Sequence, residues 1–162
     1  MSEFNIQTVC FDVDGTLTDG MYHVPDNVSV VSLTKSFYTR DVWAVEELLK
    51  SGYEVIIASQ SNDRCASNKF YNMSRRHKLL QVCRGVENKL QFLDKRIRWD
   101  ELAYVGDAEN DLECMELAAY TACPSDAIPI IQEESHFVSN YPGGKGAVYD
   151  IVLEILRLAG KG

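Results

Sequence analysis

Acidic residues stand at two places where a buried strand is expected to end. The apolar run 6–11 leads into the segment DVDGT at residues 12–16, which places the carboxylates of Asp12 and Asp14 two residues apart. The apolar run 102–105 leads into Gly106-Asp107, and Asp111 follows on the next segment. Clustered carboxylates repel one another unless a cation neutralises them, and hard oxygen ligands suit Mg²⁺, which also accepts a substrate phosphate. The acidic residues therefore predict a magnesium site.

Ser59 and Lys89 add the groups that a phosphoryl-transfer site requires. Ser59 ends the expected strand 53–58 and offers a hydroxyl, while Lys89 offers a positive charge, and both suit the oxygens of a transferring phosphoryl group. Each residue alone also has a structural explanation, because Asp commonly caps turns and helices, Ser59 could cap a helix beginning near Asn62, and Lys89 could be a solvated helix charge. Their order along the chain, each at a strand end or on the helix after it, favours one shared site.

Strands and helices alternate along most of the chain. Strands are expected at residues 6–11, 53–58, 79–83, 102–105, 120–123 and 136–138. Between them, apolar residues spaced three and four apart indicate helices, most clearly in the segment 148–159. Such alternation implies right-handed crossovers, a mainly parallel sheet with helices on both faces, and ligands at the carboxyl ends of the strands. We therefore expect an α/β, Rossmann-like fold of three layers.

Residues 21–37 interrupt this alternation. They contain two extended pieces around Pro25-Asp26-Asn27, which is the chemistry of a small β-hairpin flap. We expect no further domain inserted between residues 19 and 59 or between 59 and 89. The 162 residues have the size and balance of one globular domain, so residues 1–162 are expected to form a single domain with the hairpin as an insertion.

Composition argues against several classes of function. A formal net charge of -8 and a pI near 4.8 are unlike a nucleic-acid-binding surface, which needs clustered Lys and Arg. The 5 cysteines lack a CxxC spacing, which favours reduced thiols in a cytosolic protein. No stretch approaches the roughly 18 consecutive apolar residues of a membrane span, and the start of the sequence lacks the features of a signal peptide. We expect a cytoplasmic protein that binds neither nucleic acid nor membranes.

These residues together resemble the four motifs of the haloacid dehalogenase superfamily of phosphatases. The motifs correspond to residues 12–16, Ser59, Lys89 and the segment 106–111. The resemblance implies that Asp12 attacks phosphorus to form an aspartyl-phosphate, while Asp14 protonates the leaving oxygen and later deprotonates the attacking water. It also implies that Mg²⁺ is held by the carboxylates of Asp12 and Asp107 and by the main-chain carbonyl of Asp14.

The same resemblance suggests roles for further residues. Asp111 is expected in the second shell of the metal, where it orients water or Lys89. Lys89 is expected to act on the phosphoryl oxygens as a catalytic cation. The residues expected to bind the substrate are Ser59, Gly15, Thr16, Gln60 and Arg40.

Within that superfamily the chain is similar to the small phosphatases without a cap domain that act on 3-deoxy-D-manno-octulosonate 8-phosphate and related nine-carbon sugar-acid phosphates. The similarity rests on the segments 16–20, 39–41, 85–89 and 142–147. Two positions depart from that pattern, because Gln60 and Val42 stand where a Gly is usual. Members of this kind assemble as tetramers through their hairpins, so the resemblance implies a homotetramer joined by residues 21–37. A solvent-exposed flap is the alternative.

Two other functions compete with a sugar-phosphate phosphatase. A phosphoacceptor domain of the receiver type also combines an acidic cluster, a hydroxyl and a Lys on an α/β sheet, but there the phosphorylated Asp follows a middle strand and no DGT segment follows the acids. The second is a catalytically weak or inactive relative that serves as an assembly or regulatory module of a nucleotide-sugar pathway. Gln60 and Val42 favour this alternative, whereas the presence of all the motif acids favours the enzyme.

Overall fold

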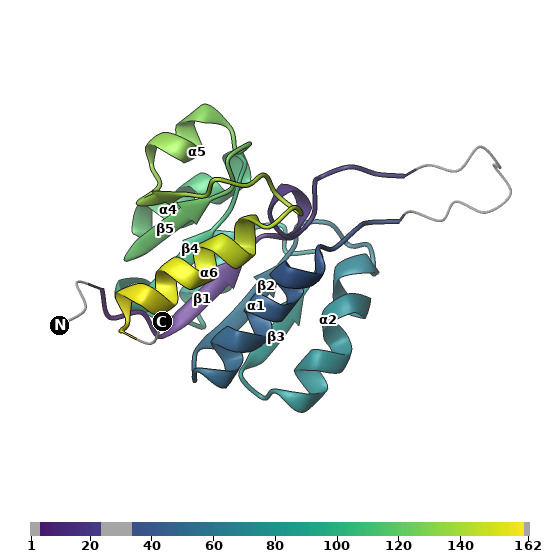
Figure 1. The fold of residues 1–162 in the computed structure, drawn as a ribbon, viewed down its shortest axis with the longest axis horizontal. Coiled ribbons are helices and arrows are strands. Elements are labelled where there is room, and N and C mark those ends of the chain that lie inside the picture. The colour runs from purple at the N-terminus through teal and green to yellow at the C-terminus, as the bar shows by residue number, and fades with distance from the viewer. Residues whose placement is uncertain (1–3, 24–33, 161–162) are drawn as a thin grey trace, which may run out of the picture.

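The computed structural model describes residues 4–23 and 34–160, and its centre is one parallel sheet (Figure 1). Six strands pair in the order β3-β2-β1-β4-β5-β6, and every pairing is parallel. The expected parallel sheet is therefore confirmed. The strands are Thr8–Phe11 (β1), Glu54–Ala58 (β2), Leu80–Cys83 (β3), Leu102–Val105 (β4), Tyr120–Cys123 (β5) and Phe137–Val138 (β6).

Helices cover both faces of this sheet and complete three layers. On one face α1, α2 and α6 share an apolar core with the sheet, and Figure 1 shows α1 and α6 lying side by side across it. On the other face α3, α4 and α5 enclose a second core. The expected three-layer α/β fold is confirmed. The helices are Thr39–Lys50 (α1), Cys65–Arg76 (α2), Lys89–Asp94 (α3), Leu112–Leu117 (α4), Pro129–Glu133 (α5) and Ala147–Leu158 (α6), with short turns at Val13–Leu17 (η1), Trp99–Glu101 (η2) and Glu109–Asp111 (η3).

The central strand β1 explains why the sequence there is continuously apolar. Val9 and Phe11 pack into the core beneath α1 and α6, while Cys10 packs into the opposite core. A strand buried on both faces has no solvent side on which polar residues would be favoured. The first polar positions come directly after it, at the edge of the sheet.

The order of the strands creates the crevice in which a ligand is expected. From β1 the chain runs outward to β2 and β3, then returns to place β4 on the other side of β1. Phe11 of β1 pairs in register with Ile57 of β2 and Val105 of β4. The residues just beyond these positions therefore meet at one edge, at the switch point where parallel sheets bind ligands.

Some elements differ from the expectation. The short helix α5 was not expected, because its five residues are too few to show a helical spacing of apolar residues. Of the hairpin expected over 21–37, the described part contains an antiparallel bridge between His23 and Thr34, while residues 24–33 lie outside the described residues. None of the helices in the described ranges is long and apolar enough to cross a membrane.

Candidate active site

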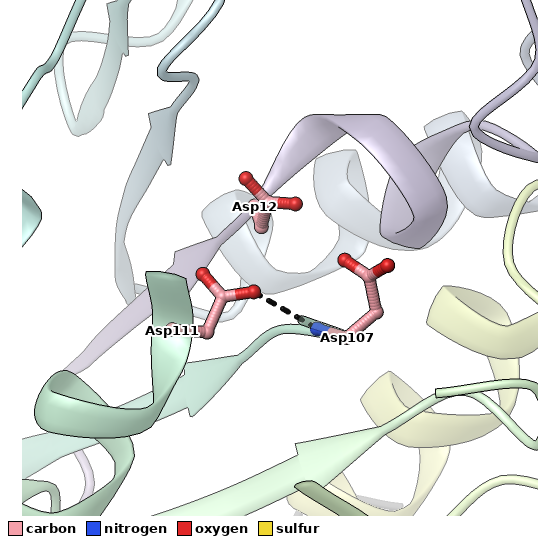
Figure 2. A group of neighbouring side chains, drawn as sticks. All are labelled: Asp12, Asp107 and Asp111. Atoms are coloured by element: carbon pink, nitrogen blue, oxygen red, sulfur yellow. Dashed lines mark hydrogen bonds between the residues drawn. The ribbon is translucent and has the colours of Figure 1, made fainter. Parts of the chain in front are cut away.

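Three carboxylates expected from the sequence converge at the switch point (Figure 2). Asp12 follows β1, Asp107 follows β4, and Asp111 lies at the start of α4. One oxygen from each lies within 4.8 Å of the others. Gly106 permits this approach, because a Cβ at that position would lie 2.6 Å from the Cβ of Asp111.

Lys89 joins two of these acids from the first residue of α3. Its Nζ lies 2.5 Å from Oδ1 of Asp12 and 2.7 Å from Oδ1 of Asp111, and all three residues are buried. Burial disfavours the charge of Lys89, but the two carboxylates outweigh this effect and hold its pKa above the ordinary value. The site therefore contains a fixed cation that orients Asp12.

Asp111 uses both of its oxygens within the protein. Oδ1 accepts hydrogen bonds from Lys89 and from the hydroxyl of Tyr104, at 2.7 Å each, and Oδ2 accepts from the N–H groups of Asp107 (2.9 Å) and Ala108 (3.2 Å). This carboxylate therefore shapes the loop after β4 and positions Lys89. Tyr104 was missed by sequence reasoning, because an aromatic residue inside a strand is far more often part of an apolar core.

The chemistry of Asp12 and Asp107 fits a divalent cation. Burial raises the pKa of Asp107 to about 6, although hydrogen bonding with Asp12 and with the hydroxyl of Thr16 opposes the shift. Burial and then the charge of Asp111 raise the pKa of Asp12 well above its ordinary value. Asp12 is buried and Asp107 half-buried, and two such acids whose charged forms are disfavoured, with hard oxygen atoms close together, are what Mg²⁺ stabilises. Since Asp111 is already engaged, Asp12 and Asp107 are the carboxylates left to hold the ion.

The loop after β1 is shaped around Asp107. Gly15 has a φ of +85°, and a Cβ there would lie 2.7 Å from Cγ of Asp107. The hydroxyl of the buried Thr16 donates to Oδ1 of Asp107 at 3.2 Å, and the N–H of Gly15 faces Oγ1 of Thr18 at 3.4 Å. Both residues thus support a candidate metal ligand. Their expected contact with substrate phosphate stays a prediction.

The segment 142–147 supports this loop from behind. The N–H of Gly144 donates to the carbonyl of Thr16 at 3.1 Å, and a Cβ on Gly143 would lie 2.6 Å from the carbonyl carbon of Gly15. Asp41, in the first turn of α1, is fully buried and accepts hydrogen bonds from the N–H groups of Gly146 and Tyr149. The resemblance rests partly on the segments 39–41 and 142–147. Residues in these segments therefore also have a structural role, because they support the loop after β1 and join α1 to the start of α6.

A hollow of about 430 Å³ opens beside the acidic cluster. Gln60 lies in its wall as expected, and the amide of Asn110 donates to Oε1 of Gln60 at 3.3 Å. Val42, in contrast, packs against the main core. The residues that line the hollow are Asp12, Asp14, Tyr22, Gln60, Ser61, Ala108 and Asn110.

The structure places the remaining expected residues in two different regions. Ser59 is buried just beyond β2, where its N–H donates to the carbonyl of Cys83 and its carbonyl accepts from Val86. Phe11 pairs with Ile57, so Ala58 is level with Asp12, and Ser59 lies one residue beyond it at the same edge of the sheet. Arg40 is exposed and lines a separate hollow with Tyr38, Tyr141 and Lys145. Within one chain, Arg40 is therefore not part of the hollow beside Asp12.

Asp14 has a partner that the sequence did not reveal. Its side chain is 33% exposed to the hollow, and its Oδ1 lies 2.6 Å from Nζ of Lys35. Lys35 is a single Lys within the segment 21–37, beyond the two extended pieces expected there, so neither spacing nor periodicity distinguished it. Its second partner is Asp63, whose Oδ2 lies 2.5 Å from Nζ.

Comparison with known proteins adds relatives that cover nearly the whole chain. The 3-deoxy-D-manno-octulosonate 8-phosphate phosphatase KdsC of Salmonella typhi is 30% identical over 167 residues, which cover 97% of this chain and 82% of that protein. No family model matches the sequence.

Solved structures agree with this relationship. A protein from Legionella pneumophila assigned to subfamily III A of the haloacid dehalogenase superfamily superposes with a TM-score of 0.86 at 26% identity, over 97% of this chain and 85% of that chain. The cobalt-bound deoxy-D-mannose-octulosonate 8-phosphate phosphatase of Haemophilus influenzae superposes with a TM-score of 0.79 at 26% identity, over 97% and 91% of the two chains.

Proposed function

The chain belongs to the 3-deoxy-D-manno-octulosonate 8-phosphate phosphatases of the haloacid dehalogenase superfamily, and we propose that it hydrolyses the phosphate monoester of a sugar acid of this kind. The observation that carries the proposal is the convergence of Asp12, Asp107, Asp111 and Lys89 at the switch point, beside an open hollow. A structural or regulatory module would not require two buried acids, Asp12 and Asp111, beside the buried Lys89, because removing charged groups from water is costly.

The reaction proceeds in two displacements at Asp12. In the first, the carboxylate of Asp12 attacks phosphorus, Asp14 delivers a proton to the sugar oxygen, and the bond between phosphorus and that oxygen breaks. In the second, Asp14 takes a proton from a water molecule, whose oxygen attacks phosphorus and releases phosphate from Asp12. Lys89 holds Asp12 in one orientation through their 2.5 Å contact and stabilises negative charge on the phosphoryl oxygens.

Mg²⁺ is the cation that this donor set fits. Asp12 and Asp107 would hold it with their carboxylates, together with the main-chain carbonyl of Asp14. When bound, the ion supplies positive charge that neutralises the acids and the phosphoryl oxygens. Asp111 would not be a ligand, since its oxygens are occupied by Lys89, Tyr104 and backbone N–H groups.

The substrate is an eight- or nine-carbon ulosonate phosphorylated on its terminal hydroxyl. The name of the Salmonella typhi relative supports the eight-carbon compound. Several residues that line the hollow beside Asp12 have polar groups that can bond to sugar hydroxyls, among them Gln60, Ser61 and Asn110.

The active form is a homotetramer joined by the hairpins of residues 21–37. The described residues of one chain leave the phosphate site open, and water in an open site screens the charges that stabilise a transition state. A symmetric assembly that lays one subunit against the next restores this enclosure. In such an assembly the exposed Arg40 is available to a neighbouring subunit.

Phosphate release from a panel of esters tests the proposal. The panel contains phosphorylated eight- and nine-carbon sugar acids, common sugar phosphates and 4-nitrophenyl phosphate, each assayed with Mg²⁺ and with EDTA. We expect the highest kcat/KM on one of the sugar-acid phosphates and no turnover with EDTA. No phosphate release from any ester would contradict the proposal and favour the inactive-module alternative.

A further inference from the structure

We infer that Lys35 is a positioning residue for the acid/base step, which holds the carboxylate of Asp14 against the wall of the substrate hollow. The inference rests on the proposed function, because it concerns how that site handles a proton. It gives Lys35, which lies in the described part of the segment 21–37, a role other than assembly.

The contacts of Lys35 connect three separate parts of the chain. Its Nζ lies 2.6 Å from Oδ1 of Asp14 in the loop after β1, and 2.5 Å from Oδ2 of Asp63 ahead of α2. Nζ also lies 5.2 Å from the centre of the ring of Tyr22, which lines the hollow. One cation therefore joins the acid/base residue to both the first described part of the segment 21–37 and the segment after β2.

Asp63 is itself held in place, so Lys35 has a firm anchor. The hydroxyl of Ser61 donates to Oδ2 of Asp63, and the N–H of Cys65 donates to Oδ1 at 3.1 Å. The backbone of Ser61 is fixed in turn, because its carbonyl accepts from the N–H of Gly85 at 3.0 Å. Burial alone would raise the pKa of Asp63, but hydrogen bonds from Lys35 and Ser61 lower it to about 2. Asp63 is therefore a carboxylate at neutral pH.

The burial of Lys35 indicates positioning rather than substrate binding. Its side chain is only 1% exposed, although Asp14 beside it is 33% exposed. Two of the three N–H donors of the ammonium group face Asp14 and Asp63. Asp14 is thus the group that reaches the hollow, and Lys35 acts through it.

Fixing Asp14 matters because proton transfer depends on geometry. A general acid must lie within hydrogen-bond reach of the oxygen that it protonates, and a displacement of about 1 Å can lower the rate by roughly 10²-fold. An ester with a poor leaving group needs this proton, whereas an activated aryl ester does not. Loss of Lys35 should therefore be visible mainly on the sugar-acid ester.

A double-mutant cycle between Lys35→Met and Asp14→Asn tests the inference. We expect Lys35→Met to lower kcat on the best sugar-acid phosphate by about tenfold or more, with much smaller losses on 4-nitrophenyl phosphate and in KM. Lys35→Arg should restore most of the rate on the sugar-acid ester, because it keeps the cation. In the Asp14→Asn background, Lys35→Met should change kcat by less than about twofold, because residues that act as a unit are not additive.

A matched control is Lys50→Met, because Lys50 is exposed on α1 and pairs only with Glu47 among the described ion pairs. We expect its kcat on both esters to equal that of the wild type. If Lys35→Met fails to fold by circular dichroism, Asp63→Asn provides a second test. It removes the anchor and should give a smaller loss with the same preference for the sugar-acid ester.

The outcomes separate this inference from the function on which it rests. Equal losses on both esters, or an undiminished effect of Lys35→Met in the Asp14→Asn background, would show a structural role and overturn the inference alone. A wild-type protein that releases no phosphate from any ester would overturn the proposed function, and the role of Lys35 with it.

Discussion

Replacing Gly15 by Ala should have two separate effects, strain in the backbone and a steric clash with Asp107. Gly15 has a φ of +85°, and its missing Cβ leaves room for the carboxylate of Asp107. An Ala in left-handed backbone costs roughly 1–2 kcal/mol. Its Cβ would also lie 2.7 Å from Cγ of Asp107, whereas carbon atoms in contact are about 3.5–4.0 Å apart. Asp107 must therefore retreat by about 1 Å.

The two costs have different consequences. Strain in the backbone lowers stability, and about 1–2 kcal/mol corresponds to a Tm lower by about 2–8 °C for a chain of this size. The displacement of Asp107 instead disturbs a candidate metal ligand, and a misplacement of about 1 Å can reduce the rate by roughly 10²-fold. We expect Gly15→Ala to show both effects, with weaker Mg²⁺ binding as the cause of the slower turnover.

Gly52 offers the matched control. Its φ is +90°, yet a Cβ there would meet nothing within 4 Å, and it precedes β2 at the end of the sheet opposite the acidic cluster. Gly52→Ala should therefore lower the Tm by a similar amount and leave kcat unchanged. Thermal unfolding, phosphate release at several Mg²⁺ concentrations, and calorimetric Mg²⁺ titration measure these effects. Nearly full activity in Gly15→Ala, or equal activity losses in both variants, would refute the reasoning.

Four further expectations concern the same site and the hairpin. Asp12→Asn should remove turnover while circular dichroism stays unchanged, because the change is nearly isosteric and deletes the nucleophile; substantial activity would contradict this role. Chelation with EDTA should abolish phosphate release, and added Mg²⁺ should restore it. Lys89→Met should lower the free energy of unfolding by about 3–5 kcal/mol in urea titrations, since it leaves buried carboxylates without their cation; an unchanged midpoint would count against the ion pairs. Light scattering should report a tetramer of the 18.3 kDa chain, and deletion of residues 23–31 should give smaller species with weaker activity, whereas a fully active monomer would exclude the assembly.

The features that could be predicted from sequence are those that follow a regular pattern. The strands followed from apolar runs, because a strand buried on both faces, such as β1, has no polar positions. The meeting of Asp12, Asp107 and Asp111 followed from topology, because parallel strands end at the same edge of a sheet. Lys89 followed from the chemistry that a phosphoryl group requires and from its place on the helix after β3.

The features that were missed depend on tertiary contacts. Tyr104 resembles any core aromatic residue until its hydroxyl is seen 2.7 Å from Asp111. Lys35 carries no periodic or motif signal, and its partners Asp14 and Asp63 lie 21 and 28 residues away in the chain. Arg40 was expected at the substrate from the resemblance, and within one chain it lines another hollow, so its contact with a substrate stays a prediction that involves a neighbouring subunit. Only the folded arrangement decides which charged side chains meet.

The placement of charges around the hollow suggests how an open site can keep its acidic side chains oriented. Each of the two acids that we propose to be catalytic faces one lysine with a buried side chain: Lys89 contacts Asp12, and Lys35 contacts Asp14. Each lysine also has a second carboxylate that is tied to backbone N–H groups, namely Asp111 for Lys89 and Asp63 for Lys35. The ion pairs are therefore arranged in the same way on both sides, and the two acids are held by groups that water hardly reaches. The pair of Lys89 with Asp12 is buried on both sides and is screened much less than an exposed pair, while Asp14 is 33% exposed and only its lysine is buried. We therefore expect the orientation of Asp12, more than that of Asp14, to be independent of closing the hollow. Enclosure by a neighbouring subunit would then act mainly on the substrate and on the attacking water.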